Sequence, residues 1–350
     1  MKFDALLSEP QLAGVARLAR EVEELGYDGL MTAEVKRDPF LPLAIAAEHT
    51  RRLEVGTSVA VALPRNPVHL AQTAHDLQAL SGGRCILGLG SQVRAHIENR
   101  FSAEWSHPAA RMEELVRAIR AIWRCWEEGG PLDFQGRFYR HVLTPGEHHP
   151  GPTGQRPPKV FLGAVGETMT EIVGAVGDGL FVHSFATERF LRQVTLPALE
   201  RGLARSGRRR EDVEICLVLF VITGRTDEEV AEARDAVRQQ IAFYGSTPAY
   251  RTVLEVHGWG DLQSELNRLS KLGRWKEMTE LVDDEILAAF SVDTSRDDVS
   301  TAVRRRYGDF VDRVALYAPY EHRPGHWANL IDRMAGLEAF PAVPVEAALG

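Results

Sequence analysis

The chain has 350 residues, of which 44% are hydrophobic and 26% are charged, and its formal net charge is −8. Such a chain can bury a large core, and its acidic balance argues against nucleic acid as a partner, because phosphate backbones are bound by clustered cationic surface. No apolar run approaches the length that crosses a membrane, the amino terminus lacks a signal-peptide pattern, and the three cysteines form no disulfide framework. We therefore expect a protein of the reducing cytoplasm, with Cys85 and Cys216 as buried thiols.

Short apolar runs alternate with helical patterns in the first half of the chain. Apolar residues recur at helical spacing between Leu12 and Leu25, and Gly26 is placed to end that helix. Asn66 and Pro67 supply an N-cap and a first-turn proline for a helix that stops at residues 82–83. Strands are predicted at residues 3–7, 30–33, 53–58 and 84–89.

The second half repeats this alternation. Thr226 with Glu229, and Ser295 with Asp298, have the spacing of capping boxes at helix starts. Strands are predicted at residues 160–163, 180–183, 213–222 and 314–317. Eight strand–helix units in one chain predict an α/β fold of the (β/α)8 TIM-barrel type, with an open doubly wound sheet as the alternative.

Two segments interrupt the alternation. Residues 131–158 are rich in Pro, Gly and His and are expected to form an ordered loop, with a small hairpin near residues 134–139. Residues 245–294 are polar and helical and lie between the seventh and eighth strands, where an insertion would cover the strand ends and shape a substrate pocket. The prediction is one barrel domain over residues 1–337, including this insertion, followed by a tail at residues 338–350.

The side chains that follow the strands of a barrel converge on one face, so these positions are the candidates for chemistry. Gly88-Leu89-Gly90 resembles the start of a dinucleotide-binding fingerprint, but Val93 occupies the position of its third glycine. Residues 163–166, Gly-Ala-Val-Gly, leave a strand and enter a helix, where backbone N–H groups and the helix dipole can hold a phosphate. A tight turn that needs glycine for its backbone shape explains this pattern equally well.

Metal sites and nucleophiles have weaker signals. His148 and His149 lie in a Pro/Gly loop, and His322 and His326 are spaced for one helical face near Glu321, but neither pair has a convergent third ligand in the sequence. No Gly-x-Ser-x-Gly elbow is present. We therefore predict no metal site and solvated histidines at these positions.

An ordered set of short motifs runs along the chain. The motifs are Gly56-Thr57-Ser58-Val59, Arg65-Asn66-Pro67, Leu80-Ser81-Gly82-Gly83-Arg84, Leu87-Gly88-Leu89-Gly90, Gly136-Arg137-Phe138-Tyr139, Pro157-Pro158-Lys159-Val160-Phe161-Leu162-Gly163 and Gly177-Asp178-Gly179. Together they resemble the luciferase-like monooxygenase superfamily, most closely its deazaflavin (coenzyme F420)-dependent oxidoreductases. The resemblance implies a bacterial-luciferase-like barrel that binds F420, acts on a small organic molecule and forms a homodimer.

The resemblance also implies roles for residues at the strand ends. The Ser58-Val59 link matches the place of a non-prolyl cis peptide bond that bulges against the cofactor ring, and residues 163–166 match the turn that wraps its phosphate. Glu34 matches an acidic or amide position near the ring, and His96 matches a polar residue that touches it. Val35 stands where relatives often carry histidine, which argues against the sugar-phosphate dehydrogenase reaction of some of them. The predicted cofactor-binding residues are Ser58, Val59, Gly90, Gln92, Gly163, Ala164, Val165, Gly166 and His183.

The function that this resemblance implies is hydride transfer between F420 and a small organic substrate, which also requires a group that supplies or removes a proton. We predict Glu34 or His96 as this proton carrier; His96 is better tuned near neutral pH, but it would serve equally as a hydrogen-bonding residue. Arg94 and Lys36 are expected to steer the anionic tail of the cofactor. Two alternatives are an FMN-dependent two-component monooxygenase in the same barrel and a non-catalytic flavin-binding barrel.

Overall fold

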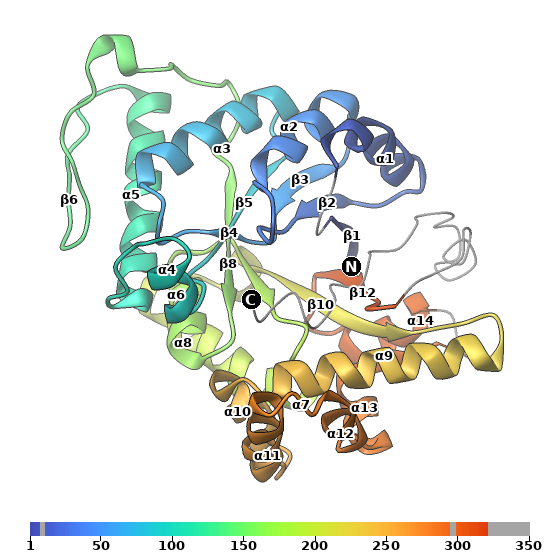
Figure 1. Ribbon diagram of the computed structural model, residues 1–350. Helices are drawn as coiled ribbons and strands as arrows, with labels where there is room; N and C mark the ends of the chain where they lie inside the picture. Colours follow the sequence, from blue (N-terminus) through green and yellow to red (C-terminus); the bar gives the residue numbers. More distant parts are fainter. Residues whose placement is uncertain (8–10, 295–298, 321–350) are drawn as a thin grey trace.

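Eight parallel strands close into a barrel in the computed structural model, which describes residues 1–7, 11–294 and 299–320 (Figure 1). The barrel strands are β1 (Lys2–Leu7), β2 (Gly29–Thr32), β3 (Glu54–Thr57), β5 (Cys85–Gly90), β8 (Lys159–Ala164), β9 (Gly179–Val182), β10 (Glu214–Ile222) and β12 (Arg313–Tyr317). They pair in chain order, and the last strand returns to the first, with Val314 beside Phe3. The predicted TIM barrel is confirmed, and the open doubly wound sheet is excluded.

Each of the eight predicted strands coincides with a barrel strand, with small differences at the ends. Two further short strands were not predicted. β4 (Ala60–Val61) pairs with the end of β5, and β11 (Ser291–Asp293) pairs with the end of β10. Both are too short to show a periodic pattern in the sequence.

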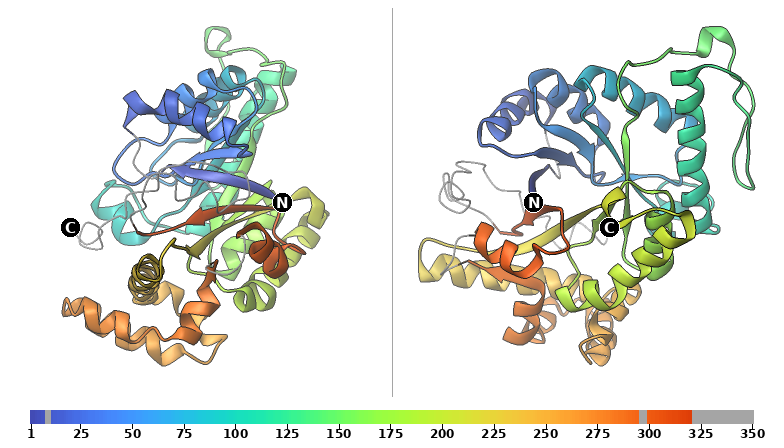
Figure 2. Two further views of the ribbon diagram at one scale, coloured as in Figure 1. Left: turned by 90° about the vertical axis from the view of Figure 1, so that its right-hand side faces the viewer. Right: turned by 180° about the vertical axis from the view of Figure 1, so that it is seen from behind.

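Helices cover the outside of the barrel and connect its strands (Figure 2). They are α1 (Leu12–Glu24), α2 (Phe40–His49), α3 (Pro67–Ser81), α4 (Arg94–Asn99), α5 (Pro108–Glu128), α6 (Glu167–Val176), α7 (Glu188–Phe190), α8 (Leu196–Ser206), α9 (Asp227–Gly245) and α14 (Val299–Tyr307). None of the helices in the described part of the chain is long and apolar enough to span a membrane.

The predicted helix ends are present where the structure describes them. Asn66 caps α3 by accepting a hydrogen bond of 2.9 Å from a backbone N–H of the first turn, and Pro67 is the first helical residue. Gly82 ends this helix in the left-handed conformation, with φ 65°. Thr226 caps α9 by accepting a hydrogen bond of 3.2 Å from the N–H of Glu229. The predicted capping box at 295–298 and the predicted tail lie outside the described residues.

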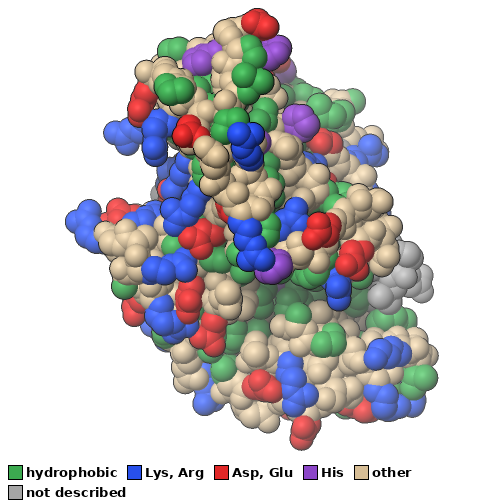
Figure 3. Space-filling view, turned by 90° about the vertical axis from the view of Figure 1, so that its left-hand side faces the viewer, with side chains coloured by type: hydrophobic (Ala, Val, Ile, Leu, Met, Phe, Trp, Pro, Cys, Tyr) green, Lys and Arg blue, Asp and Glu red, His purple; other side chains and the backbone are tan. Residues whose placement is uncertain are grey.

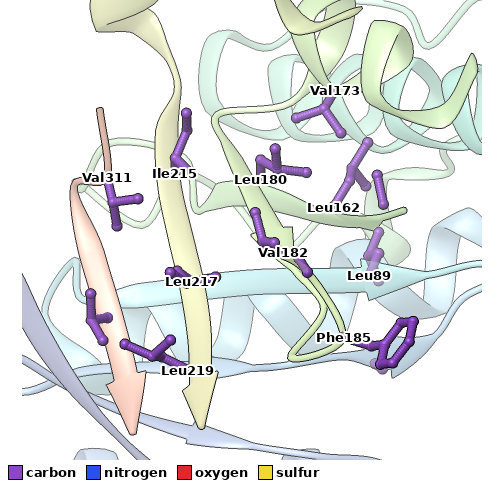
Figure 4. Packing of buried hydrophobic residues seen from close by; sticks show 14 of the residues in the cluster. Leu89, Leu162, Val173, Leu180, Val182, Phe185, Ile215, Leu217, Leu219 and Val311 are labelled. Atoms are coloured by element: carbon purple, nitrogen blue, oxygen red, sulfur yellow. The ribbon is translucent and has the colours of Figure 1, made fainter. Parts of the chain in front are cut away.

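The strands bury side chains on both of their faces, as expected in a parallel barrel. Outward side chains pack beneath the helices and include Leu89, Leu162, Leu180 and Leu217 (Figure 4). Inward side chains form a second cluster of Met31, Ile86, Phe161, Phe181 and Cys216. The thiols of Cys85, Cys125 and Cys216 are buried and free, which confirms the prediction made for the first and the last of them.

The amino end of the barrel is closed by a network of three cations and three anions. Its members are Lys2, Asp4, Glu54, Lys159, Glu214 and Arg313. The fully buried Arg313 guanidinium donates to both carboxylate oxygens of Asp4, at 2.9 and 2.6 Å, and to Glu54 at 2.5 Å. Burial would raise the pKa of Glu54, but the charges of Arg313, Lys2 and Lys159 hold it at about 2. The network therefore joins the first strand to the last.

Arg84, which ends one of the motifs that carry the family resemblance, also lies at this end. Its guanidinium donates to the backbone carbonyls of Ala47, Thr50, Leu53 and Ser81 and to the Thr50 hydroxyl. All five of its N–H groups are thereby used, and carbonyls at the end of α2 are satisfied. This motif builds the support of the barrel rather than its site.

The long loop after α5 contains the predicted hairpin, formed by β6 (Phe134–Gln135) and β7 (Arg140–His141), and it projects from the barrel (Figure 1). Glu114 of α5 accepts hydrogen bonds from three successive backbone N–H groups of residues 137–139, at 2.9, 2.6 and 2.7 Å. A Cβ at Gly136 would collide with the same carboxylate. The turn of the hairpin is thus anchored to α5.

The predicted helical insertion lies between β10 and β12. It comprises α10 (Arg251–Glu255), α11 (Gly260–Lys271), α12 (Trp275–Glu280) and α13 (Asp284–Phe290), followed by β11. Tyr250, just before α10, lies with its ring 4.9 Å from that of His183, and Phe290 stacks on Phe185 at 4.5 Å. The insertion therefore returns to the carboxyl end of β9, the end on which catalytic groups of such barrels lie.

Candidate active site

The predicted site residues are carried by the carboxyl ends of neighbouring strands. Glu34 follows β2, Ser58 and Val59 follow β3, Gly90 ends β5, Gly163 is the last residue but one of β8, and His183 follows β9. Because these strands are parallel and the barrel is closed, their carboxyl ends share one face. The molecular surface has a hollow between its upper and lower parts, with hydrophobic side chains at the bottom (Figure 3).

Val59 connects three of the strands. The Ser58–Val59 peptide bond is cis, the form that the resemblance implies. A Cβ built on Gly90 would lie 2.5 Å from Val59 Cγ2, and a Cβ built on Gly163 would lie 3.5 Å from Val59 Cγ1. The absent side chain of Gly90 therefore leaves the space that Val59 occupies, and the ends of β3, β5 and β8 meet at this residue.

Glu34 is tied to a neighbour that the sequence did not reveal. Its Oε2 accepts hydrogen bonds from Arg65 Nη1 at 2.6 Å and from the backbone N–H of Val61 at 2.7 Å, and its Oε1 accepts one from Arg65 Nη2 at 3.0 Å. The Glu34 side chain is only 8% exposed. Protonation of Glu34 would weaken this bidentate ion pair. The arrangement therefore favours a role for Glu34 in fixing the loop after β3.

His96 lies on α4, the short helix that follows β5. Its ring Nδ1 is buried and has no hydrogen-bond partner among the residues that the structure describes. Gln92, in the loop before this helix, adopts a left-handed conformation with φ 58°, and its side-chain oxygen accepts a hydrogen bond of 3.0 Å from the N–H of Val93. A buried ring nitrogen without a partner is the kind of group that a bound molecule satisfies.

The turn at residues 163–166 opens directly into α6. Gly166 is the N-cap of that helix and offers no side chain to its first N–H groups. Neither Gly163 nor Gly166 has a positive φ, and a Cβ at Gly166 would meet nothing within 4 Å. Backbone shape therefore does not explain these glycines, which weighs against the tight-turn interpretation. The exposed start of α6 suits an anion such as a phosphate.

His183 is part of an aromatic group rather than a cationic one. Its ring lies 4.7 Å from that of Tyr244 and 4.9 Å from that of Tyr250. Its Nδ1 accepts a hydrogen bond of 3.0 Å from the N–H of Phe185, and burial lowers its pKa to about 4, so the ring is neutral at pH 7. Sequence reasoning did not place the two tyrosines because both precede irregular turns of the insertion.

This half-buried histidine makes the stability of the protein pH-dependent. Between pH 7 and pH 5, the free energy of unfolding of the wild type should fall by about 2 kcal/mol more than that of a His183→Gln variant. The unfolded chain takes up a proton near the ordinary pKa of 6.5, whereas the folded chain resists protonation until about pH 4. Stability from this group is therefore complete above pH 6.5 and is lost as the pH falls toward 4.

Urea denaturation at pH 5, 6 and 7 measures this effect. The two tyrosine rings that face His183 stay uncharged over this range, so the difference between wild type and variant reports on the histidine itself. Parallel pH profiles for the two proteins would contradict the prediction.

The predicted cations are not gathered at the site. Arg94 pairs with Glu98 at 3.0 Å, one turn along α4, and its side chain is 69% exposed. Lys36 is exposed on the loop after β2, and Arg100 donates to the backbone carbonyl of Val35 on the same loop. The structure gives no contact between Arg94 and the start of α6, so the role in steering an anionic tail stays a prediction.

One of the histidines considered for a metal, His149, has other partners. His149 Nε2 hydrogen-bonds the carbonyl of Cys125 at 3.0 Å, and its Nδ1 accepts from the N–H of Gly151 at 3.1 Å. This histidine therefore fastens the long loop to α5. The described residues contain no group of three or more side chains that could hold a metal ion, and His322 and His326 lie outside them.

Comparison with known proteins bears directly on this arrangement. The chain matches the luciferase-like monooxygenase family over residues 2–313. An uncharacterized protein of Mycobacterium tuberculosis is 54% identical to it over 314 residues, which cover 90% of this chain and 92% of the relative. A putative coenzyme F420-dependent oxidoreductase of the same organism is 31% identical over 290 residues, which cover 78% of this chain and 81% of the relative.

Solved structures agree on the architecture. The coenzyme F420 dependent tetrahydromethanopterin reductase from Methanopyrus kandleri superposes with a TM-score of 0.70, covering 90% of this chain and 92% of that protein. Its sequence identity is 19%, so this likeness shows the fold alone. The family match spans every strand up to the start of β12 and includes Val59 and its two glycine neighbours. The chain belongs to the luciferase-like monooxygenase family.

Proposed function

We propose that this protein is an oxidoreductase that binds coenzyme F420 at the carboxyl ends of its barrel strands and exchanges a hydride with a small organic substrate. Its family and the 31% identical relative, a putative coenzyme F420-dependent oxidoreductase, support the cofactor class. The observation that carries the proposal is the position of Val59 between Gly90 and Gly163. Gly163 belongs to β8, and the turn after this strand leads into the uncapped start of α6.

The residues present suit such a cofactor. Val59 offers an apolar surface to a planar ring, and the unpartnered Nδ1 of His96 offers a polar contact. The N–H groups after Gly166 offer hydrogen bonds to an anionic tail. When bound and reduced, a deazaflavin supplies two electrons as a hydride, so the protein has to orient the substrate and manage one proton.

We assign that proton to His96 rather than to Glu34. The Glu34 carboxylate accepts three hydrogen bonds, two from Arg65 and one from the N–H of Val61. Taking up a proton would remove the negative charge that pairs with the Arg65 guanidinium. His96 has a buried ring nitrogen without such a commitment, and histidine is the side chain that most often acts as a general acid or base. Glu34 then supports the β3–β4 loop that presents Val59.

Fluorescence titration with oxidised F420 and with FMN tests the proposal. We expect saturable binding of F420 and binding of FMN that is about tenfold weaker or more. Gly90→Ala should weaken F420 binding, because its Cβ would lie 2.5 Å from Val59 Cγ2 and displace that side chain. Gly14→Ala is the matched control, since a Cβ there meets nothing within 4 Å.

The other outcomes identify other functions. Tight binding of FMN without binding of F420 would replace the proposal with an FMN-dependent two-component monooxygenase. Binding of neither cofactor would favour a non-catalytic barrel. Equal F420 affinity in the Gly90→Ala variant would place the cofactor away from Val59.

A further inference from the structure

The backbone fixes the hydrogen-bonding state of His183. The N–H of Phe185 can only donate, and it faces His183 Nδ1 at 3.0 Å. The neutral ring therefore carries its proton on Nε2. This Nε2 lies 3.4 Å from the hydroxyl oxygen of Tyr250. The tyrosine oxygen thus accepts from the histidine, and its own hydrogen is directed elsewhere.

The hydroxyl groups of Tyr244 and Tyr250 differ in their hydrogen bonds. The Tyr244 hydroxyl shares hydrogen bonds with Tyr317, Ser184 and Gln240, so its hydrogen-bonding capacity is used inside the protein. For the Tyr250 hydroxyl, His183 is the hydrogen-bond partner found among the described residues. Tyr250 therefore keeps a donor for a molecule bound beside it.

The surroundings of this pair are aromatic. Phe185 stacks on Tyr250 at 5.7 Å, and Tyr244 lies edge-on to His183 at 4.7 Å. Burial lowers the pKa of His183 to about 4. The group of rings formed by His183, Tyr244, Tyr250 and Phe185 is therefore uncharged at pH 7. Its place is set by β9, where Val182 pairs with Ala164 of the turn that opens into α6.

We propose that Tyr250 and His183 form the subsite for the oxygen atom of an uncharged carbonyl substrate, with the Tyr250 hydroxyl as the donor and His183 as its positioning residue. A ketone or aldehyde oxygen accepts this hydrogen bond, and the apolar body of the molecule packs against the rings. Among the described residues, this group of rings offers no cation to a carboxylate or phosphate. The inference rests on the proposed function for the reaction that follows, but the subsite can be tested without it.

A pair of ring molecules of the same shape tests the subsite directly. Cyclohexanone carries an acceptor oxygen, whereas methylenecyclohexane has a CH₂ group in its place. We expect the wild-type protein to bind cyclohexanone about fivefold more tightly, which corresponds to one neutral hydrogen bond. Ligand-detected NMR titrations, with and without oxidised F420, measure both affinities.

Matched variants assign the preference to the two residues. Tyr250→Phe should abolish the preference for cyclohexanone, and Tyr27→Phe, which removes a hydroxyl before β2 at the other end of the barrel, should keep it. His183→Phe should reduce the preference. His183→Gln should retain it, because the amide can place an N–H where the Nε2–H lies.

The results separate the two proposals. An unchanged preference in Tyr250→Phe, or no binding of cyclohexanone by the wild type, would overturn the subsite. Equal loss in His183→Gln and His183→Phe would overturn the positioning role. Failure to bind F420 would overturn the proposed function, yet the probe preference of the protein without cofactor would still decide on the subsite.

Discussion

Replacing His96 by Ala should slow single-turnover hydride transfer by about 100-fold or more, the usual contribution of a positioned acid or base. The expectation follows from the buried Nδ1 of His96, which has no partner in the described structure, and from the engagement of Glu34 by Arg65. The measurement is stopped-flow absorbance of enzyme-bound reduced F420, which is oxidised as it gives its hydride to a carbonyl compound that a substrate screen identifies.

A separate binding measurement distinguishes chemistry from affinity. If His96 moves the proton, the variant keeps most of its F420 affinity and loses rate, whereas a residue that only contacts the cofactor loses affinity instead. His49→Ala is the control, because this exposed histidine at the end of α2 hydrogen-bonds its own helix at Ile45, away from the site. An unchanged single-turnover rate in His96→Ala would remove the residue from the reaction.

Replacing Arg313 by Met should lower the free energy of unfolding by about 3–5 kcal/mol, the range found when one partner of a buried ion pair is removed. The substitution leaves the Asp4 carboxylate, which is 0% exposed, without the guanidinium that now donates to both of its oxygens. Glu54 and Glu214 lose a shared cation as well. Urea denaturation at pH 7 gives the value.

Arg17→Met provides the surface comparison. Arg17 pairs with Glu21 one turn along α1 at 2.7 Å, and its side chain is 73% exposed, so its loss should cost less than about 1 kcal/mol. A similar small loss in Arg313→Met would mean that water reaches the amino end of the barrel. In that case, the network would contribute little to stability.

The architecture was predictable because each of the eight barrel strands leaves a local signal. The alternation of apolar runs with helical patterns marked all eight barrel strands, and Asn66-Pro67 marked a helix start through the chemistry of the cap itself. β4 and β11 gave no such signal, because strands of two or three residues have no period to detect.

The details of the site depend on contacts between distant segments. Glu34 could be placed at a strand end, but its pairing with Arg65 joins residues 31 positions apart and depends on how the loop after β3 turns. The approach of Tyr250 to His183 spans 67 positions and depends on the path of the insertion. Sequence patterns report which face of an element is buried, but they do not report which side chains meet across it.

The ion pair between Asp4 and Arg313 joins residues that are 309 positions apart, which matters for biosynthesis. During translation, β1 leaves the ribosome long before the strand that completes its second edge has been made. Until then the nascent chain carries an open sheet edge and an acidic side chain whose cation has not yet been made. A product released before residue 313 would therefore be a target for chaperones and proteases rather than a smaller working enzyme.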